Sequence, residues 1–387
     1  MTPRVLLAHA LLWPNIGRLS SAFRRAGFEV GAVARSSHPV HRMHSPNRTY
    51  PYRPTAAGAS LSDAIQDYRP DLIVPCDDRV VGHLCALFER AAEGPRTRGA
   101  VDVRKLIETS LGLQTARGRV SKRSLLAELS GLADVHVPQI DTIDSLVDLR
   151  AWVARNGLPA VLKLDGSWGG QDVILMRTKA QIARAFFEIR FRRSSLMRLK
   201  RMLFNGDVEA LVTGATGAQI CVQAFVPGRL ANTAMVCWQG EVLATVAVEV
   251  VRTQKLFGRA TIVRQVGGEQ MVAAGCAIAQ HLELSGLYGL DFVLNEVSGA
   301  ASLLEINPRA TQVHHLSAGP GVDLPAVMFG ALTGAAVETS HIAPVLREIA
   351  LFPNQLGGPT RDYLSSTFQD VPYDEPELAK YYGYQAI

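Results

Sequence analysis

The sequence predicts an α/β protein of several domains, with a Rossmann-like parallel sheet at the N-terminus and a β-rich body behind it. Its 387 residues exceed the usual size of one domain, so we expect two or three. Short apolar segments alternate with helical patterns over residues 1–105, whereas residues 218–265 carry mostly strand patterns. A hydrophobic content of 48% with 19% charged residues is typical of a globular chain with a real core.

Residues 1–105 predict three parallel strands connected by helices. The strands are RVLLAHA (4–10), FEVGAVA (28–34) and DLIVPC (71–76), and the helices lie in IGRLSSAFRRAG (16–27) and LSDAIQDYRP (61–70). This βαβαβ order implies a doubly wound sheet. No GxGxxG follows the first strand, which argues against a nicotinamide oxidoreductase.

Several polar residues lie in the loops that follow these strands. In doubly wound sheets, ligands bind at the carboxyl ends of the strands. Two interpretations stay open for these residues, namely ligand contacts or ordinary turn and cap positions. They are His9, Asn15, His38, Asp77 and Asp78.

Beyond residue 105 the patterns predict a mixed region and then a β-rich lobe. Helical patterns dominate residues 106–155, and a strand, a glycine-rich turn and a second strand follow in LPAVLKLDGSWGGQDVILM (158–176). After the strands of 218–265 we expect a helix over 268–284 and a β-hairpin over 288–307. The tail, 341–387, is expected to pack across the surface.

The predicted hairpin brings two carboxylates together. Centring it near Ser298 places Asp291 opposite Glu305, Val293 opposite Leu303, and Asn295 opposite Ala301. Side chains alternate between the faces of a strand. We therefore expect one polar face and one core face. The polar face holds Asp291, Glu305 and Asn307, and the core face holds Phe292, Leu294, Leu304 and Ile306.

Two opposed carboxylates repel one another unless a cation lies between them. Mg²⁺ prefers oxygen ligands and often takes one or two carboxylates together with phosphate oxygens. Arg309, two residues beyond Asn307, has a guanidinium that can clamp an anion. The alternative is an ion pair between Glu305 and Arg309, but that pairing leaves Asp291 unexplained.

A glycine-rich turn suggests that the metal binds together with phosphate groups. In VLKLDGSWGGQDV (161–173), Lys163 ends a strand, and three glycines follow at 166, 169 and 170. Glycines let backbone N–H groups approach phosphate oxygens, and a lysine adds a point charge. The GK[ST] ending of a Walker motif is absent, and the turn is weak evidence by itself.

In their order along the chain, these motifs resemble the ATP-grasp superfamily. The resemblance rests on Lys122 in VSKRSLL, Lys163 with its glycine turn, the strand VQAFVPG (222–228), and the hairpin that ends in EINPR (305–309). It covers about residues 105–335. It implies a Rossmann-like pre-ATP-grasp domain (1–105), a linker with a small lid subdomain (106–225), a C-terminal ATP-grasp lobe (226–340), and a C-terminal extension (341–387).

The resemblance also implies roles for individual residues. Lys122 and Lys163 would contact the α- and β-phosphates of ATP. Gln223 and the backbone from Ala224 to Val226 would recognise the adenine, with the Gln223 oxygen accepting from the adenine amino group. The loop 166–170 would close over the triphosphate, and Asn232 would replace the acidic ribose ligand that relatives commonly carry near Leu230. These cofactor-binding candidates are Lys122, Lys163, Gly166, Ser167, Gly169, Gly170, Gln223, Ala224, Phe225, Val226 and Asn232.

The remaining candidates concern the metal and the transferred phosphoryl group. By resemblance, Asp291, Glu305 and Asn307 hold Mg²⁺, for which Mn²⁺ can substitute, and Arg309 stabilises transferred phosphate or substrate. Arg252 and Arg264 are further candidates for a γ-phosphate or carboxylate, and ordinary charges on a strand face are an equal alternative.

The implied activity is that of an ATP-dependent carboxylate–amine ligase. A small-molecule carboxylate would become an acyl phosphate, which an amine would attack to give an amide, ADP and phosphate. Three alternatives stay open within the fold: a kinase, a carboxylation-coupled enzyme, and an ATP-binding regulator without turnover.

Charge and cysteine content limit which partners and which cellular location we expect. Residues 184–201 hold seven Lys or Arg and one Glu, and this local excess accounts for the net charge of +5. We consider three roles for this stretch, in order of preference: a solvated helical face, attraction of an anionic substrate, and contact with a membrane surface. Because the excess of positive charge is local, we expect no nucleic-acid partner. Five scattered cysteines and the lack of any apolar run long enough to span a bilayer predict a cytoplasmic protein. A homodimer paired through the N-terminal domain is one option for its assembly.

Overall fold

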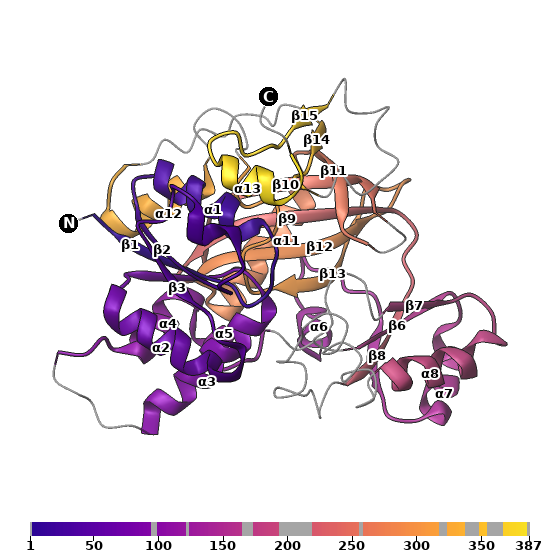
Figure 1. Cartoon of the computed structure of the whole chain (residues 1–387). Coiled ribbons are helices and arrows are strands. Elements are labelled where there is room, and N and C mark those ends of the chain that lie inside the picture. Colours follow the sequence, from indigo (N-terminus) through magenta and orange to yellow (C-terminus); the bar gives the residue numbers. More distant parts are fainter. Residues whose placement is uncertain are drawn as a thin grey trace.

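The computed structural model describes residues 2–93, 99–120, 124–164, 173–192, 219–254, 258–316, 323–336, 348–353 and 367–384. These ranges form three sheets that follow one another along the chain (Figure 1). A parallel sheet at the N-terminus and a seven-stranded sheet lie together, and a small antiparallel sheet with its helices projects to one side (Figure 1). Within the described ranges, no helix is long and apolar enough to cross a membrane.

The N-terminal domain confirms the predicted parallel sheet and adds one strand. Its order is β3 (Arg48–Pro51), β2 (Glu29–Ala34), β1 (Arg4–Ala8) and β4 (Leu72–Pro75), with every neighbouring pair parallel. The sequence patterns missed β3 because this short edge strand, RTYP, has no buried residue and therefore no apolar run.

Helices cover both faces of this sheet. They are α1 (Asn15–Arg25), α2 (Ala57–Tyr68) and α3 (Asp78–Glu93), with short 3₁₀ turns η1 (Pro39–Arg42) and η2 (Pro54–Ala56). Next come α4 (Val103–Leu111), α5 (Leu113–Ala116) and α6 (Ser124–Leu129). Leu106, Ile107 and Leu111 of α4 belong to the same hydrophobic core as β1 and α2. Helix α4 therefore packs with the N-terminal domain and crosses the boundary that we expected at residue 105.

The small antiparallel sheet has the order β5 (Ile140–Ile143), β8 (Ile220–Ala224), β6 (Ala160–Leu164) and β7 (Val173–Met176). Helices α7 (Leu146–Asn156) and α8 (Gln181–Arg192) pack on one side through buried residues that include Trp152, Phe186 and Ile189. Ser145 and Asp148 form a capping box that sets the start of α7. Helix α8 covers the first part of the basic stretch, and residues 193–201 of that stretch lie outside the described residues.

The large sheet has the order β13, β12, β9, β10, β11, β14 and β15. Its strands are β9 (Arg229–Trp238), β10 (Glu241–Thr253), β11 (Ala260–Gln265), β12 (Gly286–Leu294), β13 (Ala301–Asn307), β14 (Glu348–Ala350) and β15 (Phe368–Gln369). Helix α11 (Glu269–Leu282) and helix α12 (Leu324–Thr333) contribute to two different hydrophobic cores beside it. The sheet places the predicted hairpin, β12 and β13, at one edge.

The predicted pairing of the hairpin is confirmed at the end that carries Asp291 and Glu305, and the predicted register is wrong near the turn. Asp291 pairs with Glu305 as expected. A β-bulge then follows, so that Phe292 pairs with Leu303 and Val293 pairs with Ser302. Bulges place two residues opposite one and shift all later pairs. As a consequence, Leu303 lies in the core, and Leu304 faces the cavity that also holds Glu305.

The C-terminal segment does more than lie across the surface, as the sequence had suggested. β14 and β15 extend the large sheet, and α13 (Pro376–Tyr381) contacts the N-terminal domain (Figure 1). The Glu375 carboxylate accepts hydrogen bonds from the backbone N–H groups of His44 and Ser45 at 3.0 and 2.7 Å. Asp370 is buried and pairs with both Arg18 and His315. The segment therefore ties the two large parts of the molecule together.

Candidate functional site

A cavity of about 530 Å³ lies where the three sheets meet. The N-terminal domain contributes the loop and helix start around Trp13 and Asn15, together with Asp78. The small sheet contributes Lys163 and Gln223. The hairpin contributes its polar face, and strands β9 to β11 contribute further lining residues. The predicted polar residues of four separate segments thus share one cavity.

The carboxylates of the hairpin lie side by side in this cavity. Glu305 on β13 is in register with Asp291 on β12. Burial, with the negative charge of Glu305 beside it, raises the pKa of Asp291 to about 6. The amides of Asn232 and Asn307 donate hydrogen bonds to the two oxygens of Asp291 and partly offset this shift. The pair therefore holds repelling charge that a cation would neutralise.

The fit of this pair to Mg²⁺ follows from the chemistry of its donors. No described residues form a group of three or more His, Cys, Asp or Glu that could hold a metal. Two carboxylates are nevertheless the protein ligands that Mg²⁺ commonly takes when phosphate oxygens complete its shell. The Asn307 oxygen already accepts from Arg309 Nη2 at 3.0 Å, so Asn307 can join the shell only by turning away from that partner.

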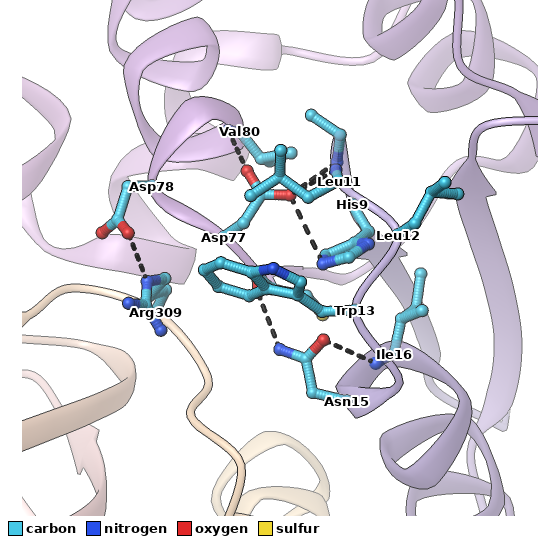
Figure 2. A network of polar contacts seen from close by, with 12 residues as sticks. His9, Leu11, Leu12, Trp13, Asn15, Ile16, Asp77, Asp78, Val80 and Arg309 are labelled. Atoms are coloured by element: carbon cyan, nitrogen blue, oxygen red, sulfur yellow. Dashed lines mark hydrogen bonds and ion pairs between the residues drawn. The ribbon is translucent and has the colours of Figure 1, made fainter. Parts of the chain in front are cut away.

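Arg309 is held by the N-terminal domain. Its Nε lies 2.9 Å from Asp78 Oδ2, and the acidic charge around it raises its pKa despite burial. Figure 2 shows this contact and the ring of Trp13 beside the guanidinium. The predicted alternative, an ion pair between Glu305 and Arg309, is replaced by this contact with Asp78. The N-terminal domain thus orients a guanidinium that the hairpin of the large sheet carries.

Lys163 and Gln223 occupy neighbouring strands of the small sheet. Lys163 is 8% exposed, and its Nζ donates to Gln223 Oε1 at 2.5 Å. The Gln223 side chain is buried, and its Nε2 has no partner among the described residues. We expected the Gln223 oxygen to accept from a base. In this structure Lys163 engages that oxygen, and the side-chain amide N–H remains as the group that a ligand could use.

The segment after Gln223 also lines the cavity, as expected for Ala224, Phe225 and Val226. The N–H of Ala224 donates to Gln139 O, and the N–H of Phe225 donates to Pro159 O. Apolar side chains complete this end of the cavity, and they are Val161, Val173, Leu175, Leu230, Val293 and Leu304. A flat, mostly apolar group fits such a surface.

Other predicted residues lie elsewhere. Asn232 lines the cavity, but its amide donates to Asp291, which commits it to the carboxylate pair. Arg252 and Arg264 are not among the residues that line the cavity, and Arg264 pairs with Glu348 at 2.6 Å. Their phosphate role stays a prediction. Lys122, Gly166, Ser167, Gly169 and Gly170 lie outside the described residues.

The structure adds residues that the motifs did not indicate. Trp13 and Arg259 line the cavity, and the Arg259 guanidinium lies 4.7 Å from the Trp13 ring centre. Two histidines that the sequence had offered as candidates lie behind this loop. His9 is buried, with Nε2 3.6 Å from Asp77 Oδ2 (Figure 2), and His38 Nε2 lies 2.9 Å from the Trp13 carbonyl. A single tryptophan in a predicted loop carries no motif. The only available signal was its place after the first strand.

The family comparison bears on the part of the chain that carries the hairpin. Residues 203–313 match the model of the ATP-grasp domain. The match includes β12, β13 and the carboxylate pair between them. The chain contains an ATP-grasp domain. The order of its motifs along the sequence had indicated this superfamily, and the fold prediction is confirmed.

Solved ATP-grasp structures share the fold at low sequence identity. The biotin carboxylase domain of a 2-oxoglutarate carboxylase from Hydrogenobacter thermophilus has a TM-score of 0.60 and 14% identity, and the match covers 90% of this chain and 73% of that one. An L-amino acid ligase from Bacillus licheniformis has a TM-score of 0.53 and 12% identity, with 86% and 74% covered. These likenesses establish the fold.

Two curated relatives match part of the chain. They are formate-dependent phosphoribosylglycinamide formyltransferases of Burkholderia vietnamiensis (strain G4 / LMG 22486) and Paraburkholderia xenovorans (strain LB400). Each is 29% identical over 170 residues, which is 43% of this chain. The match spans only 37% of the length of each relative.

Proposed function

We propose that this ATP-grasp protein is an ATP-dependent ligase that activates a small-molecule carboxylate as an acyl phosphate and joins it to an amine. The observation that carries the proposal is the Asp291–Glu305 pair, which shares one cavity with Lys163 and with Arg309. A metal site, a phosphate-binding lysine and an anchored guanidinium are the groups that phosphoryl transfer to a carboxylate requires.

The site residues that line the cavity each have a role in this reaction. The apolar end of the cavity near Phe225 would receive the adenine, with the Gln223 amide N–H as a donor. Lys163 would approach the phosphates. Asp291 and Glu305 would hold Mg²⁺, which when bound neutralises phosphate charge. Arg309, oriented by Asp78, would align the attacking carboxylate with the γ-phosphorus.

The chemistry needs no nucleophile from the protein. The substrate carboxylate would attack the γ-phosphoryl group in line, ADP would leave, and the amine would then displace phosphate from the acyl phosphate. None of the five cysteines forms a disulfide, and burial raises the pKa of four of them, which agrees with this scheme and with a reducing, cytoplasmic location.

The direct test is ADP release from Mg-ATP with a panel of small carboxylates, alone and paired with amines. ADP formation that requires both a carboxylate and an amine supports the ligase. ADP formation with one hydroxylated compound alone would indicate a kinase, and a requirement for bicarbonate would indicate a carboxylation-coupled enzyme. Nucleotide binding without turnover on any pair would favour a regulator.

Replacing Lys163 should weaken nucleotide binding. In Lys163→Met we expect the Kd of Mg-ADP to rise by about 10- to 100-fold, because one charged hydrogen bond to phosphate is lost. Isothermal titration calorimetry measures this change. Lys179→Met is the matched control, because Lys179 is an exposed lysine of the same small domain and lies outside the cavity lining. An unchanged Kd in Lys163→Met would remove the phosphate role of this lysine.

A further inference from the structure

Arg259 occupies an unusual position in the cavity. It precedes β11 and lies on the face of Trp13, which belongs to the loop after β1. Arg309 approaches the same ring, with its guanidinium carbon 5.5 Å from the ring centre. Two guanidinium groups from the C-terminal lobe therefore contact one aromatic side chain of the N-terminal domain, and all three line the cavity.

The arginines of this region differ in how their charge is balanced. Arg309 pairs with Asp78, and Arg18 pairs with the buried Asp370. Among the described residues, the Arg259 side chain makes no ion pair and no hydrogen bond, and its guanidinium lies over the ring of Trp13. Its surroundings hold one further positive charge, that of Arg309, which works with burial to lower its pKa.

Tyr382, the other ionisable neighbour of Arg259, does not supply a negative charge. Tyr382 acts on Arg259, but burial raises the pKa of its phenol, and its hydroxyl donates to the carbonyl of Leu12 at 2.9 Å. The phenol therefore stays neutral at physiological pH. A partly buried guanidinium without a counter-charge is costly, because the charge loses water and gains no anion. Binding an anion there would recover that cost.

We propose that Arg259, held on the ring of Trp13, binds a second anionic group of the substrate, so that the carboxylate substrate is a dianion. The class comprises dicarboxylates and phosphorylated carboxylates. This inference rests on the proposed ligase function, since it assigns the reacting carboxylate to Arg309 and the second anion to Arg259. The loop that carries Trp13 follows a strand of the parallel sheet, at the edge where such sheets bind ligands.

Direct binding tests the proposal without knowledge of the natural substrate. The full chain is loaded with Mg-ADP and titrated by calorimetry with acetate, succinate and inorganic phosphate. We expect wild-type protein to bind at least one dianion more tightly than acetate. In Arg259→Met that dianion should bind about 10- to 100-fold more weakly, while acetate binding is unchanged. Which dianion loses affinity distinguishes a dicarboxylate from a phosphorylated substrate.

Two controls separate the possible failures. Arg155→Met removes an exposed arginine of α7 and should bind every probe like wild type. Arg259→Lys keeps a positive charge and should recover part of the dianion affinity. Equal dianion binding in wild type and Arg259→Met overturns the proposal, and so does a wild type that prefers acetate. A matching loss of Mg-ADP affinity in Arg259→Met would assign Arg259 to the nucleotide instead. Failure of wild type to bind Mg-ADP at all would overturn the ligase function itself.

Discussion

Glu305→Gln should lower the turnover number for ADP release by about 1,000-fold while the protein stays folded. The amide removes one of the two carboxylates proposed to hold Mg²⁺, so the charge of the transferring phosphoryl group is no longer neutralised. The folded state should not suffer, because Glu305 is a cause of the raised pKa of Asp291 and its loss relieves that repulsion. Steady-state kinetics and the unfolding temperature in the absence of metal measure the two effects.

A second readout on the same variant does not depend on the substrate. Mg-ADP should raise the unfolding temperature of wild type and have a smaller effect on Glu305→Gln, because at a fixed ligand concentration the stabilisation falls as the Kd rises. Glu296→Gln, at the exposed turn of the same hairpin, is the matched control and should behave like wild type. Wild-type turnover in Glu305→Gln would remove the metal assignment.

The free energy of unfolding should fall steeply as the pH drops from 7 to 5. Burial lowers the pKa of His9, His38 and His314 to about 3 in the folded protein. In the unfolded chain these histidines have pKa values near 6.5. Between about pH 6.5 and pH 3 they therefore bind protons in the unfolded chain and stay neutral in the folded protein. Each ring costs about 2 kcal/mol of stability between pH 7 and pH 5. Urea unfolding at pH 7, 6 and 5 measures this loss.

A variant of His38 isolates one ring. His38 Nδ1 accepts from the Val40 N–H at 3.1 Å and caps η1, and asparagine can make the same bond without titrating. His38→Asn should therefore reduce the loss between pH 7 and pH 5 by about 2 kcal/mol. The lost contact with the Trp13 carbonyl affects both pH values and cancels in the difference. His44→Gln, at an exposed position, should keep the wild-type loss. An unchanged loss in His38→Asn would contradict the buried neutral state of this ring.

Local patterns were sufficient for the elements with strong periodicity. The buried strands β1, β2 and β4 are short apolar runs, and the pairing of Asp291 with Glu305 follows from the two-residue period of a hairpin. The bulge after Asp291 could not be predicted, because the register beyond it depends on what packs against each face. The edge strand β3 was missed for a similar reason, since no buried face marks its sequence.

The sequence by itself indicated the ATP-grasp fold, through the resemblance that its motifs show in their order along the chain. It also indicated the carboxylate pair, through the two-residue period of a hairpin. Only the tertiary structure decided which partners the other polar groups contact: Asn232 and Lys163 donate hydrogen bonds to Asp291 and Gln223, and Arg309 forms an ion pair with Asp78. It also brought Arg259 against Trp13. Each of these partners lies far from the other in the chain, and packing of the three sheets around one cavity sets their contact. No pattern within a single segment records such a contact.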